Sequence, residues 1–242
     1  QDVGVRFYTY IATLQLVMEA CAQAGIPVLV LDRPNPNIHY VDGPVMEAAH
    51  RSFLGMTEIP LVYGMTIGEY ARVINEEGWL ADGLKAELEV IPLGNYSRDY
   101  RYELPIPPSP NLPNAQAVRL YPSLGLFEGT HVNAGRGTTR QFQRFGAPFL
   151  LANHFDYSYI PEPRPGATHP KQEGMQCHGR DLSEVHPPDS VDLKWLVEAY
   201  AHRDPAAPFF KTSGFTRHAG TERLQKQIEA GWDAARIRES WQ

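Results

Sequence analysis

The sequence has few cysteines, no long apolar run and no excess of basic residues. Its 242 residues include only Cys21 and Cys177, so we expect neither a disulfide framework nor a zinc ribbon. No apolar stretch approaches the roughly 20 residues that a membrane-spanning helix needs. Lys and Arg number 22 against 28 Asp and Glu, a formal charge of -6, which disfavours nucleic acid as the main partner. Disorder is also disfavoured, because 43% of the residues are hydrophobic.

The first recognisable unit is a helix followed by a strand. Residues 11–24 carry apolar side chains at helical spacing, and Gly25 suits the position just after a helix. Residues 26–31 are a continuous apolar run, which predicts a strand buried on both faces. This order is typical of an α/β sheet. Asp32 follows at the carboxyl end of the strand, where such sheets gather their ligands.

The rest of the chain divides into regular and proline-rich segments. Thr66 and Glu69 form a capping box, which predicts a helix to about residue 77. Five prolines within 105–113 exclude a helix or a central strand there. We expect a further strand at 86–93, an irregular stretch at 161–188, and helices at 189–202, 221–230 and 233–241. These elements predict an α/β portion at 1–150 and a smaller α+β subdomain at 151–242.

Two loops carry the side chains best suited to chemistry. After Asp32, two prolines stiffen a loop that presents Arg33 and Asn35. Such groups suit the hydroxyls and amides of a sugar, although a simple turn with a local Asp–Arg pair is the alternative. A glycine-rich loop at 127–139 offers Glu128, His131, Asn133 and Arg136, and its spacing excludes a phosphate-binding P-loop. Its alternative is a glycine-rich turn with a surface arginine.

Two other groups of residues leave alternatives open. Arg6 and Tyr10 belong to an aromatic segment that could stack on a pyranose ring or could pack in the core. His154, His169 and His178 lie at spacings that fit no zinc template, so we expect no metal site.

Several motifs together resemble one family. They are the opening Gln1 to Tyr10, Asp32-Arg33-Pro34-Asn35-Pro36, Gly64 to Glu69, Pro108 to Pro113, and Glu128-Gly129-Thr130 with Gly135 to Thr139. Their order and spacing over most of the chain resemble the exo-acting β-N-acetylmuramidases of the NamZ type, long catalogued as the domain of unknown function DUF1343. Members usually extend further at both ends, so the resemblance implies a fragment that lacks the N-terminal part and the extreme C-terminus.

The resemblance implies a Rossmann-like part, incomplete at its N-terminus, and a cleft between this part and the smaller subdomain. It implies a bacterial glycosidase that releases N-acetylmuramic acid from the non-reducing end of peptidoglycan fragments during cell-wall recycling. It also implies a setting in the periplasm or cell envelope, muramyl saccharides as partners, and neither metal nor organic cofactor.

Glycoside hydrolysis normally needs two carboxylates, one on each side of the scissile bond. We expect Glu128 and Asp32 to fill these roles across the cleft. Arg136 or Arg33 would hold the lactyl carboxylate of muramic acid, because a guanidinium can bind a carboxylate through two hydrogen bonds. The other candidate substrate-binding residues are Asn35, Asn133, His131, Thr130, Tyr10, Arg6 and Asn111.

Two other functions stay open at this stage. The chain could bind amino sugars without catalysis, or be an inactive remnant. It could also be an α/β enzyme that handles phosphate or nucleotides through the loop around Arg136.

Overall fold

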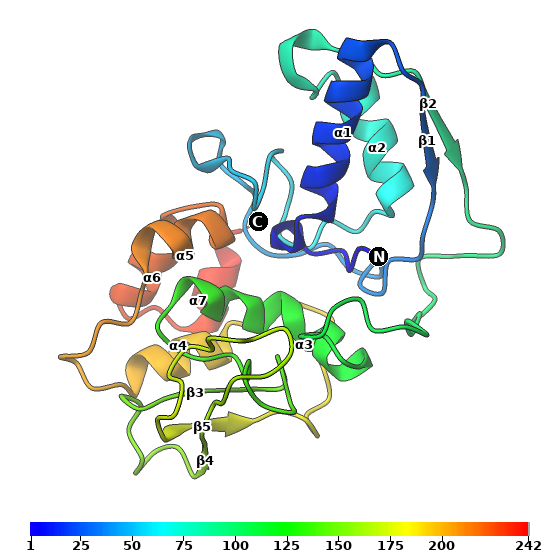
Figure 1. Ribbon diagram of the computed structural model, residues 1–242. Helices are drawn as coiled ribbons and strands as arrows, with labels where there is room; N and C mark the ends of the chain where they lie inside the picture. Colours follow the sequence, from blue (N-terminus) through cyan, green and yellow to red (C-terminus); the bar gives the residue numbers. More distant parts are fainter. Residues whose placement is uncertain (242) are drawn as a thin grey trace.

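The first part of the structure is a helix–strand unit. In this computed structural model, which describes residues 1–241, α1 (Tyr10–Ala24) ends at Gly25 with φ 65°, and β1 (Val28–Leu31) follows. The helix α2 (Ile67–Glu76) begins with the expected capping box, and β2 (Leu88–Ile91) pairs in parallel with β1. Both helices lie on the same side of the two strands (Figure 1). Their common core contains Met18, Val30, Tyr70 and Ile74.

The expectation that the first strand is buried on both faces is wrong. Val28 and Val30 are buried, whereas Leu29 and Leu31 are 57% and 65% exposed. Successive side chains of a strand point to opposite faces, so the described residues cover only one face of this sheet. The apolar run alone could not reveal this, because apolar side chains occupy both faces.

The second part is built around a small antiparallel sheet. Its strands are β3 (Arg144–Ala147), β4 (Tyr157–Tyr159) and β5 (Cys177–Asp181), in the order β3-β5-β4. The strand β5 lies within the stretch that we expected to be irregular, which corrects that expectation. A Cβ on Gly179 would lie 1.8 Å from the carbonyl oxygen of Phe145, so a glycine is needed for this close pairing. Glycine and charged residues hid the strand from the sequence pattern.

The predicted fold class is confirmed, since a parallel α/β portion is joined to a portion of helices and antiparallel strands. The division at residue 150 stays a prediction; β3 precedes that residue and pairs with β5 beyond it. None of the helices within residues 1–241 combines the length and apolar character that a membrane crossing requires.

The helices of the second part lie above the antiparallel sheet in the view of Figure 1. The helix predicted from residue 189 begins five residues later, at Lys194, and the Asp189 carboxylate accepts hydrogen bonds from Arg101 at 2.8 and 2.7 Å. The two predicted closing helices form, whereas α3 and α5 were not expected. The α-helices are α3 (Ala115–Leu124), α4 (Lys194–Ala201), α5 (Thr212–Ala219), α6 (Arg223–Glu229) and α7 (Ala234–Glu239). The short 3-10 helices are η1 (Arg6–Tyr8), η2 (Ala48–His50), η3 (Ala81–Gly83) and η4 (Gly125–Gly129).

Helix α3 tolerates a proline near its C-terminal end. The Asn114 side chain caps its N-terminus by accepting from the amide of Ala117. Pro122 has no amide hydrogen for the carbonyl of Val118 four residues earlier, but the side-chain amide of Asn37 donates to that carbonyl at 3.3 Å. A residue from the first part of the chain therefore completes a helix of the second part.

Candidate functional site

Glu128 is placed by tight packing between two helical segments. It lies in η4, directly after α3, and η4 packs against α5. A Cβ on Gly129 would lie 2.4 Å from the Cα of Phe215, so only glycine allows this close approach. Phe127 is fully buried and stacks on Phe145 at 4.9 Å between ring centroids. With its neighbours on both sides buried, Glu128 is the residue of this turn whose side chain reaches the surface.

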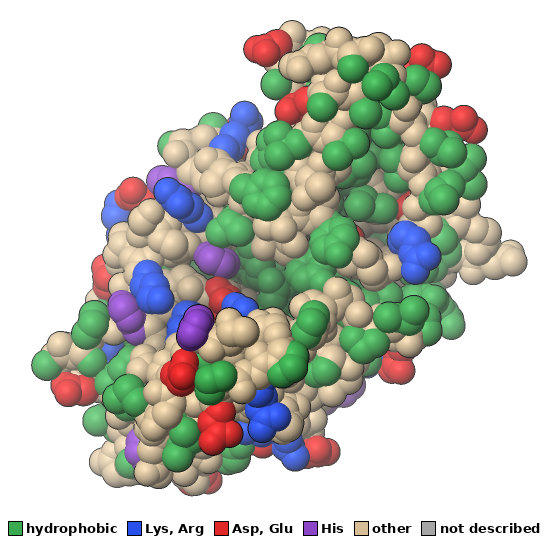
Figure 2. Space-filling model, in the orientation of Figure 1, with side chains coloured by type: hydrophobic (Ala, Val, Ile, Leu, Met, Phe, Trp, Pro, Cys, Tyr) green, Lys and Arg blue, Asp and Glu red, His purple; other side chains and the backbone are tan. Residues whose placement is uncertain are grey.

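The Glu128 side chain borders a cavity of about 210 Å³. Figure 2 shows a hollow between the two parts of the molecule, with acidic, basic and histidine side chains gathered along one edge. The residues that line the cavity are Glu128, Asn133, Ala134, Arg136, Ala167, His169, Pro170 and Lys171.

Two cations flank the Glu128 carboxylate. Arg136 Nη1 donates to Oε2 at 3.0 Å, and Lys171 Nζ lies 3.9 Å from Oε1. The side chains of Glu128, Arg136 and Lys171 are 21%, 36% and 20% exposed. Water therefore screens the charges of this cluster less than it screens those of an ion pair on the open surface. Lys171 was not among the residues expected from the sequence, because a lone lysine in a proline-rich stretch carries no motif.

Arg136 is held by a loop that glycines make possible. Gly135 and Gly137 adopt φ of 76° and 80°, in the left-handed region. Arg136 Nη2 donates to the carbonyl of Gly166 at 3.0 Å, and Asn111 donates to the same oxygen at 2.8 Å. The carbonyl of Gly166 therefore joins the proline-rich segment that contains Asn111 to the glycine-rich loop, although Asn111 itself does not line the cavity.

Asn133 and Thr130 shape the loop from within. Asn133 is 1% exposed, and its Nδ2 donates to the carbonyls of Arg136 and Lys171 at 3.0 and 2.8 Å. Its Oδ1 accepts from the amide of Gly135 at 2.6 Å. Thr130 is fully buried and donates to the carbonyl of Phe127 at 2.8 Å. Both side chains already form hydrogen bonds with backbone groups, so their contribution is to stabilise the conformation of the loop.

Two histidines stand near this cluster. Burial, followed by the charges of Lys211 and Lys171, lowers the pKa of His131. Burial also lowers the pKa of His218, whose Nδ1 lies 2.8 Å from the carbonyl oxygen of Gly214. His218 was missed from the sequence because nothing marked α5 as part of the site.

Aromatic rings continue from the cluster toward the first part of the chain. Burial raises the pKa of Tyr121, and the charge of Glu128 adds to this effect. Tyr8 meets Tyr121 edge to face at 5.7 Å and stacks on Tyr10 at 5.3 Å with an angle of 10°. Tyr10 is 42% exposed, so one face of this stack is open to a ligand.

Asp32, Arg33 and Asn35 do not line the Glu128 cavity. The Asp32 carboxylate accepts from the Gly68 amide at 2.8 Å and from the Thr66 hydroxyl at 2.7 Å, so it anchors the start of α2. Arg33 donates to the side chain of Gln1 at 3.2 Å. Asn35 is 2% exposed, and its side chain donates to the carbonyl of Met65 at 2.9 Å.

Arg6 also lies outside the cavity. Its side chain is fully buried and donates to the carbonyls of Pro44, Ile59 and Ala219 at 2.9, 2.7 and 2.7 Å. The guanidinium thereby joins the N-terminal segment to the end of α5, and burial leaves it no access to a ligand.

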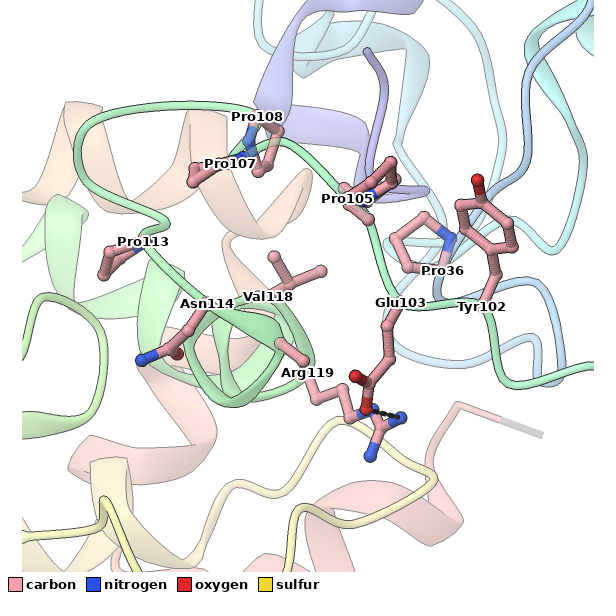
Figure 3. Close-up of a pocket in the computed structure, with 12 residues that line it drawn as sticks. Pro36, Tyr102, Glu103, Pro105, Pro107, Pro108, Pro113, Asn114, Val118 and Arg119 are labelled. Atoms are coloured by element: carbon pink, nitrogen blue, oxygen red, sulfur yellow. Dashed lines mark hydrogen bonds and ion pairs between the residues drawn. The ribbon is translucent and has the colours of Figure 1, made fainter.

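A larger cavity of about 280 Å³ lies beside the proline-rich segment (Figure 3). Pro105, Pro107 and Pro108 form one wall, and the charged groups Glu103 and Arg119 pair with each other at 3.5 Å. Tyr102 and Asn114 are the other polar residues of its lining. Within residues 1–241, no three His, Cys, Asp or Glu side chains are grouped so that they could hold a metal ion.

Comparisons with known proteins agree on one relationship. Residues 1–116 match a family model described as exo-beta-N-acetylmuramidase NamZ, N-terminal, and residues 119–242 match the corresponding C-terminal model. The chain is 35% identical over 263 aligned residues to the peptidoglycan beta-N-acetylmuramidase NamZ of Bacillus subtilis. That alignment covers the whole chain and 62% of the relative, so the chain spans less than two thirds of that protein's length.

Two solved structures have the same fold. Both are described as DUF1343 family proteins from Bacteroides fragilis. The first is 43% identical with a TM-score of 0.95, and the match covers 100% of this chain and 69% of the other. The second is 25% identical with a TM-score of 0.76, and the match covers 95% of this chain and 65% of the other.

Proposed function

Because the chain belongs to the exo-beta-N-acetylmuramidase NamZ family, we propose that it serves to release N-acetylmuramic acid from the non-reducing end of peptidoglycan fragments. The observation that carries the proposal is the Glu128–Arg136 pair in the wall of a cavity. A carboxyl group can handle protons at the glycosidic oxygen, and a guanidinium can recognise the lactyl carboxylate. Of the two carboxylates that this chemistry normally uses, Glu128 is the one that lines this cavity.

Glu128 is proposed as the acid–base group of the reaction. A general acid must reach the oxygen of the scissile glycosidic bond, and Glu128 borders the cavity. Arg136 and Lys171 lie 3.0 and 3.9 Å from its carboxylate oxygens.

Arg136 is proposed as the anchor for the lactyl group. A guanidinium has five N–H donors, and the protein uses one toward Glu128 and one toward Gly166. The remaining donors can bind an anionic ligand without breaking either contact. Lys171 lacks this freedom, because its ammonium already faces three backbone carbonyls.

The stacked rings of Tyr8 and Tyr10 are proposed as a platform for the sugar. The apolar face of a pyranose packs well against an aromatic ring, and Tyr10 is the exposed member of the stack.

Asp32 was expected to supply the second carboxylate. Its bonds to Thr66 and Gly68 instead support the proposal that it holds the strand and α2 in place.

The proposed setting is the bacterial cell envelope, where peptidoglycan fragments are produced. We propose muramyl saccharides as the partners of the site.

A chromogenic β-N-acetylmuramide tests the proposal when its hydrolysis is compared with that of the matching β-N-acetylglucosaminide, which lacks the lactyl group. Glu128→Gln is expected to lower kcat by about 100-fold or more. Arg136→Ala is expected to raise KM for the muramide by about 10-fold or more. Arg119→Ala, which removes the arginine of the other cavity, is the control. Binding of N-acetylmuramic acid without turnover would indicate a sugar-binding protein instead.

A further inference from the structure

A half-buried lysine, Lys171, lies beside Glu128 in the wall of the cavity. Lys171 Nζ donates to the carbonyls of Phe127, Glu128 and Val132 at 2.8, 3.1 and 3.4 Å. An ammonium group has three N–H donors, so these three carbonyls use all of them. Two of the three carbonyls belong to the last turn of η4, where that of Phe127 also accepts from the amide and the hydroxyl of Thr130.

We propose that Lys171, as an ammonium ion, is the positioning residue that holds the Glu128 turn in its working geometry. The inference rests on the proposed role of Glu128 in muramide hydrolysis. Lys171 does not touch the substrate in this proposal. It acts through Glu128, by binding the backbone on both sides of that side chain and by placing a positive charge 3.9 Å from its carboxylate.

The backbone of Lys171 is tied to the same loop. Asn133 donates to the carbonyl of Lys171 and to that of Arg136, so one buried amide joins the lysine segment to the arginine loop. The side chain of the next residue, Gln172, donates to the carbonyl of His131 at 2.8 Å. The turn with Glu128, the loop with Arg136 and the segment with Lys171 therefore form one hydrogen-bonded unit.

The charge of Lys171 makes this unit sensitive to alkaline pH. Burial lowers the pKa of Lys171 to about 8; the Glu128 carboxylate partly offsets this, whereas Lys211 and Arg136 add to it. A neutral amine has only two N–H donors, so one of the three carbonyls loses its bond to Lys171, and Glu128 loses a neighbouring charge. The titratable and charged groups that face Lys171 are Glu128, Arg136, Lys211, His131 and His218.

A titration of the lysine side chains tests the arrangement without requiring any activity. The Cε resonance of Lys171 can be identified by its loss in Lys171→Arg and followed by carbon NMR against pH in the full chain. We expect it to titrate near pH 8. In Glu128→Gln it should titrate lower, because the carboxylate that favours the ammonium is gone. Titration above pH 10 with the exposed lysines, or no response to Glu128→Gln, would overturn the proposal.

Kinetics with the muramide tests the positioning itself. Lys171→Met should lower kcat by about 10- to 100-fold with a much smaller change in KM, because the turn is displaced while Arg136 remains. Lys171→Arg should restore part of kcat and move the alkaline fall in rate from near pH 8 to higher pH. Lys226→Met, which removes an exposed lysine paired with Glu222, is the matched control.

The outcomes separate this inference from the function on which it rests. If the wild-type chain does not hydrolyse the muramide, the proposed function fails, while the NMR titration still decides whether Lys171 and Glu128 are coupled. If Lys171→Met keeps the wild-type kcat, the positioning role is wrong. If Lys171→Met does not fold, the pH profile of Lys171→Arg decides, and an unchanged alkaline limb overturns the role.

Discussion

Asn111 and Arg136 donate to the same backbone oxygen, the carbonyl of Gly166, at 2.8 and 3.0 Å. The two side chains come from different segments, so this carbonyl joins the proline-rich segment to the loop of the candidate site. The contact is tight, because a Cβ on Gly166 would lie 2.8 Å from the Cβ of Pro110. Arg136 is therefore positioned partly by a residue that need not touch the substrate.

Replacement of Asn111 by alanine is expected to weaken binding of N-acetylmuramic acid. The loss of one hydrogen bond at Gly166 lets that carbonyl and Arg136 move, with a cost of about 1 kcal/mol, or roughly fivefold in the dissociation constant. Isothermal titration calorimetry measures the change. Gln23→Ala, at an exposed position of α1, should leave binding unchanged, and equal affinities for Asn111→Ala and wild type would refute the link.

The Asp32 carboxylate provides a second test, since it accepts from Thr66 and Gly68 at the start of α2. Asp32→Ala is expected to lower the free energy of unfolding by about 1–2 kcal/mol, the usual cost of losing such a helix cap. Urea denaturation measures this cost, with Asp156→Ala at a 92% exposed side chain as the control. A variant that unfolds like the wild type but loses turnover would instead support the catalytic role first expected for Asp32.

The local elements of the first part could be predicted from the sequence because their signals are local. Gly25 ends α1, and Thr66 with Glu69 begins α2, each through contacts between residues close in the chain. The prediction placed Glu128, Arg136 and Asn133 together for the same reason, since one glycine-rich loop carries all three. The structure places all three at one cavity.

What could not be predicted depends on residues far apart in the sequence. Lys171 reaches Glu128 from 43 residues away, and Asn37 completes α3 from 81 residues away. The sequence of β5 does not alternate between apolar and polar residues. Its Gly179 allows the backbone of Phe145 to approach closely and has no side chain to bury. Asp32 follows β1 and was predicted to take part in the site, but its carboxylate accepts hydrogen bonds from Thr66 and Gly68 at the start of α2.

Gly129 is expected to be intolerant of a side chain. In Gly129→Ala the new Cβ would lie 2.4 Å from the Cα of Phe215, and backbone cannot move aside as a flexible side chain can. Overpacking of this kind costs about 1–3 kcal/mol, and here it would also displace the turn that carries Glu128. Thermal unfolding measures the loss. Gly94→Ala is the matched control, because a Cβ there meets no atom within 4 Å; similar melting temperatures for the two variants would contradict the packing argument.

Glu198 is expected to contribute stability that is lost in acid. Burial alone would raise the pKa of Glu198, but hydrogen bonds from Arg180 and His154 outweigh it and lower the pKa below its ordinary value of 4.5. The folded protein therefore holds the ionised form more strongly than the unfolded chain does. The corresponding stability is fully present above the ordinary pKa and is lost as the pH falls through the lower, folded-state value.

Glu198→Gln should flatten the fall in unfolding free energy below pH 4.5, when urea denaturation is repeated at several acidic pH values. The variant should be less stable than the wild type near neutral pH, with the difference shrinking in acid, because only the wild type has a charge to lose. Arg180 contacts both oxygens of Glu198 at 3.0 Å, so Arg180→Met should reproduce the same pattern. Parallel curves for the wild type and both variants across the acidic range would show that this pair does not set the acid limit of the fold.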